Sequence, residues 1–414
     1  MTAQTNETVI HAGQLLAEPG QPPKRGQSVR IAGDKIVAIA DSFVDPPEGA
    51  RLIELKNSFV LPGLIDCHVH LTAQLGPGYR LRLVEDSDPK TGLDGAYRAR
   101  LTLAAGFTTV RDVGARKPEV IFALRAAVAE GKVPGPRILC VGATLSPTGG
   151  HAQIYGFRND VCACVQSASG VCDGVDSCRK AVRAQVAQGA DAIKFVATGG
   201  VLSDISAGVD QQFTTDEIRT IIETAHHLGR RVSAHAHGAA GINAALAAGV
   251  DSIEHGSFMD DESIRLFLEH DAFHTPTIIA GMTVLEMARE GGVLSAAQSE
   301  KAFTVGEHIK AALGRSYKAG VKISFGTDMG VGPHGRNARE FGYMVEAGMT
   351  NADAIKAATV SAAELLDRTD LIGSIAPGTS ADIIAVDGDP LTDISELERV
   401  TFVMARGVRD QVDA

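Results

Sequence analysis

The sequence predicts an α/β fold: a (β/α)8 TIM barrel with a small β-sandwich domain built from both chain termini. Through the middle of the chain, short β-branched runs alternate with Ala-rich helical stretches, which is typical of βα units and a parallel sheet. Both ends instead consist of alternating apolar and polar strands. The length of 414 residues exceeds one ordinary domain and fits a large barrel with a smaller companion.

The two ends carry strand and turn signals. The segments "ETVIHAGQLL", "QSVRIAGDKIVAIAD" and "RLIELKNSFVLPG" alternate apolar and polar positions around Gly-Asp and Pro-rich turns. Near the other end, "GSIAPGTSADIIAVDGD" and "VTFVMARGVRD" show the same alternation. We therefore expect residues 1–60 and 375–414 to form the β-sandwich domain and residues 61–374 to form the barrel.

Between the ends, eight short runs have the composition of buried strands, and amphipathic or Ala-rich segments separate most of them. Eight βα units close naturally as a barrel. The runs are "GLIDCHVHL" (63–71), "TTVRDVG" (108–114), "RILCVGATLS" (137–146), "DAIKFVATGG" (191–200), "RVSAHAHG" (231–238), "SIEHGS" (252–257), "FHTPTI" (273–278) and "KISFGTDMG" (322–330).

The composition excludes several classes of partner. Hydrophobic residues make up 44% of the chain and charged residues 21%, which predicts a soluble globular protein with ample core. The formal net charge is −11 and no run is rich in Lys and Arg, so we expect neither nucleic acid nor a membrane surface as a partner. No signal peptide is visible at the start, which favours a cytoplasmic protein. A periplasmic or secreted protein whose leader had been removed is the alternative.

Four of the six cysteines crowd one Gly/Ser/Asp-rich stretch, "DVCACVQSASGVCDGVDSCRK". Their intervals do not match a paired C-x-x-C zinc module. Free thiols are the expectation for this loop, and a loop disulfide is the alternative. The four are Cys162, Cys164, Cys172 and Cys178.

Several polar residues fall at the carboxyl ends of the predicted strands, where the active sites of such barrels lie. Imidazole and carboxylate together suit zinc and its neighbours, so the shared rim predicts a metal site. In "DCHVH" the two imidazoles are one residue apart and therefore face the same side of a strand. The candidates are His68, His70, Lys194, His235, His237, His255 and Asp328.

Lys194 is unusual in such a set because an ammonium group repels a metal cation. A deprotonated lysine can add carbon dioxide, and the resulting carbamate is an anionic ligand able to bridge two metals. Alternatively, Lys194 forms an ion pair with Asp328 or holds a substrate anion. Spacing does not choose between these roles.

This arrangement resembles the amidohydrolase superfamily: His-x-His after "PGLID", Lys on the fourth strand, His on the fifth and sixth, and Asp on the eighth. Within it, the chain is most similar to the zinc-dependent dipeptidase group with Xaa-Pro and Xaa-Arg/Lys activities and to ochratoxin-type amidohydrolases. The closer likeness rests on "GGH" (149–151), "IKFVATGGV" (193–201), "HAHG" (235–238) and "SIEHG" (252–256).

The resemblance implies two Zn²⁺ per chain, bridged by carboxylated Lys194. His68 and His70, with Asp328, would hold the more buried ion. His235 and His255 would hold the more exposed one, which leaves His237 to polarise the substrate carbonyl. Asp328 would also carry the proton from the attacking water to the leaving nitrogen.

The implied substrate is a dipeptide or an N-acyl amino acid, cleaved at the amide before its C-terminal residue. This definition includes ochratoxin A. The resemblance also implies a homo-oligomer such as an octamer. The alternatives are a cyclic-amide hydrolase of the imidazolonepropionase type, against which Lys194 counts, and a catalytically inactive scaffold, against which the complete ligand set counts.

Loop residues are expected to select the substrate. His151 in "SPTGGHAQIYGF", with Tyr155 or Arg158, is a candidate for binding a substrate carboxylate, with a structural role as the alternative. The dipeptidase group has a tyrosine shortly after the fourth strand, where the matching stretch "DQQFTTDEI" has Phe213. That difference favours a bulkier or more apolar C-terminal residue than proline. Two further candidates for the pocket lining or its support are His274 and His334.

Overall fold

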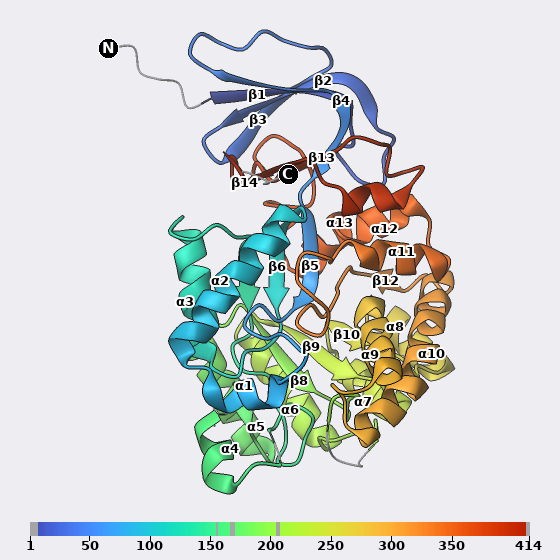
Figure 1. The fold of residues 1–414 in the computed structure, drawn as a ribbon. Helices are drawn as coiled ribbons and strands as arrows, with labels where there is room; N and C mark the ends of the chain where they lie inside the picture. The colour runs from blue at the N-terminus through green and yellow to red at the C-terminus, as the bar shows by residue number, and fades with distance from the viewer. Residues whose placement is uncertain (1–6, 155, 166–169, 204–207, 411–414) are drawn as a thin grey trace.

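Strands from both chain ends form one seven-stranded sheet (Figure 1). The computed structural model describes residues 7–154, 156–165, 170–203 and 208–410. The strand order is β15-β14-β13-β4-β1-β2-β3, and β4 pairs in parallel with β1 and antiparallel with β13. The bounds are β1 (Glu7–Leu15), β2 (Lys24–Ala32), β3 (Lys35–Ala40), β4 (Arg51–Pro62), β13 (Ile383–Val386), β14 (Phe402–Ala405) and β15 (Val408–Arg409).

Side chains alternate between the two faces of these strands, and the buried apolar ones form a separate core. This core includes Ile10, Val29, Ile383 and Phe402. Strands from both chain ends, which the sequence predicted to combine, therefore pair in one hydrogen-bonded sheet. All seven of these strands belong to a single sheet, so the structure does not confirm the β-sandwich that the sequence predicted.

Seven of the eight predicted central runs contain one strand each, and the run 108–114 overlaps β6, which begins one residue earlier at Phe107. The strands pair in parallel within their sheets. They form a three-stranded sheet, β5-β6-β7, and a five-stranded sheet, β12-β11-β10-β9-β8. Single parallel bridges, Leu145 to Phe195 and Val69 to Met329, lie between the two sheets. The bounds are β5 (Leu64–Val69), β6 (Phe107–Asp112), β7 (Arg137–Cys140), β8 (Ala192–Val196), β9 (Arg231–Ala236), β10 (Ser252–His255), β11 (Phe273–Thr275) and β12 (Lys322–Ile323).

Helices follow the parallel strands and cover them from outside, with α2 and α3 on one flank and α8 to α10 on the other (Figure 1). Capping boxes begin α6, α8 and α10. The helices are α1 (Tyr79–Glu85), α2 (Asp88–Ala104), α3 (Pro118–Ala129), α4 (Asn159–Val165), α5 (Val175–Ala187), α6 (Thr215–His227), α7 (Ala239–Ala247), α8 (Asp261–Glu269), α9 (Ile278–Glu290), α10 (Ala296–Lys318), α11 (Arg339–Glu346), α12 (Asn351–Ala357), α13 (Val360–Leu365) and the 3-10 helix η2 (Ile394–Glu398).

The strands β5, β6, β8 and β10 are buried along their whole length, as expected for parallel strands covered by helices. Polar side chains inside these strands therefore need partners in the interior. The polar residues predicted from the sequence lie at the carboxyl ends of these strands or just after them. His68, Lys194, His235 and His255 are in the last residues of strands, whereas His70, His237 and Asp328 follow strands.

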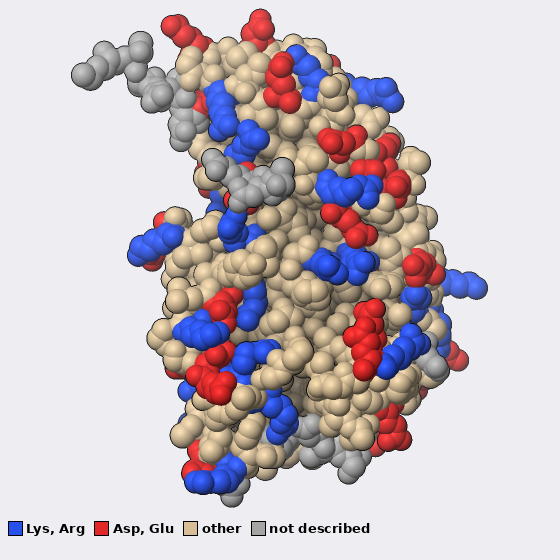
Figure 2. Space-filling model, in the orientation of Figure 1, with Lys and Arg blue, Asp and Glu red and all other residues tan. Residues whose placement is uncertain are grey.

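The surface carries both signs of charge. Figure 2 shows basic and acidic side chains interspersed over the face drawn. Among the helices that the structure describes, none is both long and apolar enough to cross a membrane. All six cysteines are free thiols in this structure.

Candidate metal centre

Two groups of potential metal ligands lie at the rim. His68, His70 and Asp328 form one group, whose ligand atoms all lie within 4.8 Å of one another. They meet because β5 ends beside the loop that follows β12, where the Asp328 amide donates to the His68 carbonyl at 2.7 Å. Asp328 has a φ of 56°, a left-handed backbone that is costly for a non-glycine residue and is typical of functional sites.

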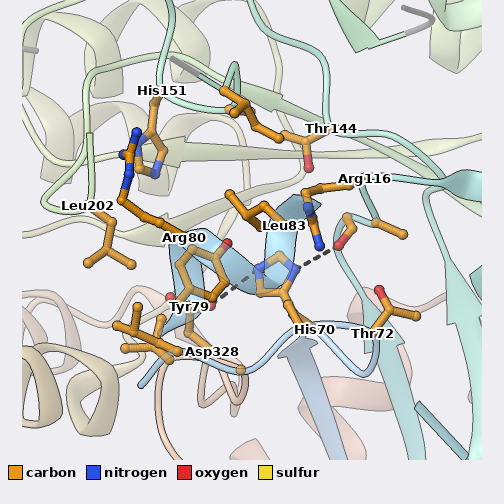
Figure 3. Close-up of a pocket in the computed structure, with 18 of the residues that line it drawn as sticks. His70, Thr72, Tyr79, Arg80, Leu83, Arg116, Thr144, His151, Leu202 and Asp328 are labelled. Carbon is orange, nitrogen blue, oxygen red and sulfur yellow. Dashed lines mark hydrogen bonds and ion pairs between the residues drawn. The ribbon is translucent and has the colours of Figure 1, made fainter. Parts of the chain in front are cut away.

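The side chains of this first group converge on one point. Oδ1 of Asp328 lies 3.5 Å from Nε2 of His68 and 3.3 Å from Nε2 of His70. The other ring nitrogen of His70, Nδ1, donates to the Gly114 carbonyl at 2.9 Å. Its Nε2 lone pair is therefore available on the side of Asp328 (Figure 3).

The second group contains His235, His237 and His255, again with all ligand atoms within 4.8 Å of one another. The ring centroids are 4.7 Å apart for His235 and His255 and 4.9 Å apart for His237 and each of the other two. The two groups adjoin, because the rings of His68 and His255 are 5.1 Å apart. This geometry does not separate His237 from the two histidines expected to be ligands.

Hydroxyl groups hold two rings of the second group. Nδ1 of His237 lies 2.8 Å from Oγ of Ser257, and Nδ1 of His255 lies 2.6 Å from Oγ1 of Thr277. Burial lowers the pKa of His237 to about 3, and burial with the neighbouring His235 lowers the pKa of His255 well below its ordinary value. These imidazoles are neutral at pH 7, the form that binds a metal.

Lys194 lies on β8 close to both groups. Its side chain is buried, and Nζ has no hydrogen-bond partner among the described residues. Burial lowers the pKa of Lys194 to about 8. Burial, and after it nearby positive charges that include Lys194, lower the pKa of both His68 and His235. A buried, unpartnered amine with a lowered pKa, beside neutral imidazoles and a carboxylate, fits a metal centre in which the lysine has become an anionic ligand.

Both groups and Lys194 line one cavity of about 1230 Å³. The loop after β5, the helices α1 and α4, the loops after β6, β7 and β8, and the helices α9 and α10 contribute to its wall. Apolar side chains from several of these elements contribute to it, including Leu83, Val113, Leu202 and Val284. A cavity of this size accommodates molecules larger than a dipeptide.

His151 lines the cavity, as the sequence analysis expected of a substrate-binding residue. Its ring stacks on His235 with centroids 4.3 Å apart, and its Nδ1 lies 2.6 Å from Oγ of Ser203. Gly200 packs directly on the ring, since a Cβ added there would lie 2.4 Å from it. Substrate contact by His151 stays a prediction.

The other predicted substrate-binding residues are placed differently. Tyr155 lies outside the described residues. Among the described residues that line the cavity, none of the remaining four appears. Arg158 is 82% exposed and pairs with Asp160, Phe213 is buried in the main apolar core, His274 binds Ser316 and the His255 carbonyl, and His334 is buried near Thr102.

Two residues that were not predicted from the sequence, Glu254 and Arg111, hold the ring of His68 in the first ligand group. Glu254 on β10 accepts a hydrogen bond from His68, and it also binds Arg111 on β6. Both side chains are fully buried. The signal was present in the sequence, because a charged residue inside an apolar strand run needs an interior partner.

The chain resembles known proteins over almost its whole length. Residues 59–409 match the amidohydrolase family. The ochratoxinase of Aspergillus niger is 34% identical over 435 aligned positions, which cover 98% of this chain and 87% of the relative.

Solved structures give the same result. A Xaa-Pro dipeptidase with methionine bound in its active site superposes with a TM-score of 0.93 at 39% identity, covering 98% of this chain and all of the relative. A prolidase in complex with N-methylphosphonate-L-proline superposes with a TM-score of 0.89 at 32% identity, covering 98% and 99% of the two chains.

Proposed function

This chain belongs to the amidohydrolase family and is an enzyme that hydrolyses amide bonds, and from this premise we propose that it is a binuclear zinc hydrolase that cleaves the amide before a C-terminal amino acid. The substrates are dipeptides or N-acyl amino acids. The observation that carries the proposal is the pair of adjoining ligand groups with the unpartnered amine of Lys194 beside both.

His68, His70 and Asp328 would hold one zinc ion, and His235 and His255 the other. Lys194, carboxylated by addition of CO₂ to its amine, would bridge the two ions. When bound, zinc polarises a carbonyl group and lowers the pKa of water toward neutrality. Burial and nearby positive charges lower the pKa of His68 and His235, and burial lowers the pKa of Lys194, which supports this assignment.

Two side chains act on the reacting groups. Asp328 accepts a proton as water attacks the carbonyl carbon, and it then delivers that proton to the leaving nitrogen, which departs poorly unless protonated. His237 donates a hydrogen bond from Nε2 to the carbonyl oxygen. This requires the tautomer in which the Ser257 hydroxyl donates to Nδ1, and the 2.8 Å separation of the two atoms allows it.

The size and lining of the cavity support substrates with a bulky apolar part. The name of the Aspergillus niger relative points to ochratoxin, and the dipeptidase relative binds methionine. We therefore propose N-acyl amino acids with an apolar C-terminal residue as the preferred class, with ochratoxin A among them.

We also propose that the eight parallel strands constitute a (β/α)8 barrel and that residues 61–374 form the catalytic domain. The single bridges between the two parallel sheets and the TIM-barrel type of the family support this. A homo-oligomer stays a prediction from the resemblance.

The test combines metal analysis with a substrate panel. We expect two zinc ions per chain by inductively coupled plasma mass spectrometry. We also expect release of one free amino acid from N-acyl-phenylalanine or N-acyl-methionine, faster than from the proline, arginine or lysine analogues. One zinc per chain, with cleavage of a cyclic amide such as hydantoin and none of the panel, would replace this proposal with the cyclic-amide alternative.

A further inference from the structure

Arg116 is a cation of the cavity wall that has no protein partner. It follows β6, it is half-buried, and its side chain points into the cavity (Figure 3). Within the described part of the chain, no carboxylate forms an ion pair with its guanidinium and no acceptor receives a hydrogen bond from it. A partly desolvated guanidinium without an acceptor is costly, so an anion that enters the cavity gains by binding it.

The backbone that carries Arg116 is tied to the first ligand group. The carbonyl of Gly114, two residues earlier, accepts the hydrogen bond from His70. The Ala115 amide donates to the Gly142 carbonyl at 2.8 Å, and the Thr144 hydroxyl donates to the Val113 carbonyl at 3.0 Å. These hydrogen bonds fix the backbone from which the Arg116 side chain extends relative to the candidate metal centre. A residue that determines specificity requires such a fixed position.

The acidic residues of the same cavity are mostly engaged elsewhere. Asp86 pairs with Lys90, Asp160 pairs with Arg158, and Asp328 belongs to the metal centre. Lys117, the residue after Arg116, also lines the cavity and adds positive charge. Asp88, the fourth acidic residue among the described residues of the lining, is exposed and forms no ion pair with Arg116. The lining therefore leaves Arg116 available to an anion of a ligand.

We propose that Arg116 binds the C-terminal carboxylate of the substrate. This inference rests on the proposed function, because a substrate cleaved before its C-terminal residue carries that carboxylate beside the scissile amide. A guanidinium fork matches a carboxylate in geometry and charge, which is why arginine is suited to this role. Recognition then selects substrates with a free C-terminus over C-terminal amides.

The test compares Arg116→Gln with the wild type on N-acetyl-phenylalanine and on N-acetyl-phenylalanine amide, which differ only in the carboxylate. We expect kcat/KM for the acid to fall about 10- to 100-fold, mainly through KM, while that for the amide stays within about twofold. Metal content is expected to be unchanged. Arg183→Gln, which removes an exposed arginine of α5, is the matched control.

Two further measurements make every outcome decisive. If Arg158→Gln lowers the preference for the acid and Arg116→Gln does not, the inference is overturned. Calorimetric binding of N-acetyl-phenylalanine gives a readout that is independent of cleavage. If the wild type binds this acid without cleaving it, the proposed function fails. The inference about Arg116 is then judged by whether Arg116→Gln weakens binding. If the wild type neither binds nor cleaves it, both fail.

Discussion

His68 on β5 donates a hydrogen bond from Nδ1 to Oε2 of Glu254 on β10 at 2.7 Å, and this contact determines how the histidine faces the metal centre. Arg111 and Ser252 bind the other carboxylate oxygen at 2.8 Å and 2.6 Å. Burial opposes ionisation of Glu254, but Arg111 and Lys194 hold its pKa well below its ordinary value. With the proton fixed on Nδ1, the Nε2 lone pair of His68 faces Asp328.

Replacing Glu254 is therefore expected to weaken metal binding. Glu254→Gln keeps the shape of the side chain but removes the charge that orients His68, and partners of this kind contribute about 10- to 100-fold in metal affinity. Chelator competition measures this. Glu340→Gln is the control, because Glu340 is also buried but caps α9 through the Ile278 and Ile279 amides. Wild-type affinity in a folded Glu254→Gln variant would contradict the assignment.

Asp328→Asn is expected to slow turnover by about 10²–10⁴, the usual scale for a positioned acid–base. Asparagine tolerates the left-handed backbone at this position and keeps one oxygen that can bind metal, so the protein should fold. The measurement is kcat together with zinc per chain. Full activity with full metal content would show that another residue moves the proton.

The roles of His235 and His237 are separable by variants. His235→Asn is expected to lose zinc from the more exposed position, whereas His237→Asn retains zinc and has a lower kcat. Metal content and kcat are measured on the same preparations. If both variants lose zinc equally, His237 is a ligand and does not serve as the carbonyl hydrogen-bond donor.

Carboxylation of Lys194 predicts a dependence on bicarbonate. Metal-free wild type, reconstituted with zinc, should bind more metal when bicarbonate is added than when CO₂ is excluded. Lys194→Arg should show no such difference, because a guanidinium does not lose its proton to react with CO₂. A bicarbonate effect of equal size in both proteins would rule out Lys194 as its source.

Asp251 is expected to stabilise the fold in a pH-dependent way. It accepts hydrogen bonds from Arg231, His226 and the Val232 amide at 2.6–2.8 Å. Burial opposes ionisation, but these bonds lower the pKa of Asp251 below its ordinary value. The ionised form therefore stabilises the protein above about pH 4, and this contribution disappears as the pH falls through the folded-state pKa.

Asp251→Asn should accordingly lower the free energy of unfolding by about 1–3 kcal/mol at pH 7, and the difference from wild type should shrink below about pH 4. Urea denaturation across this range is the measurement. Asp216→Asn, which removes an exposed ion pair with Arg219, should have little effect at either pH. A difference that stays constant with pH would exclude the ionised carboxylate as its cause.

The positions of the strands, and the gathering of the residues of the candidate metal centre, were predictable from the sequence. In each βα unit the spacing of apolar residues distinguishes the strand from the helix. Parallel strands then place all their carboxyl ends at one rim. Residues such as His68 and Asp328 therefore had to come close together although 260 positions separate them. The order of strands alone was sufficient for this inference.

Only the tertiary structure decided which side chains support the centre and which line the cavity. Glu254 on β10 and Arg111 on β6 come from two strands that are distant in sequence, and no local pattern links them. Phe213 follows a predicted strand and His274 lies within one, yet both side chains pack into the interior, while Arg116 points into the cavity. The order of the strands specifies where the backbone of a residue lies. The direction of its side chain depends on loop conformation and on packing against residues far away in the sequence.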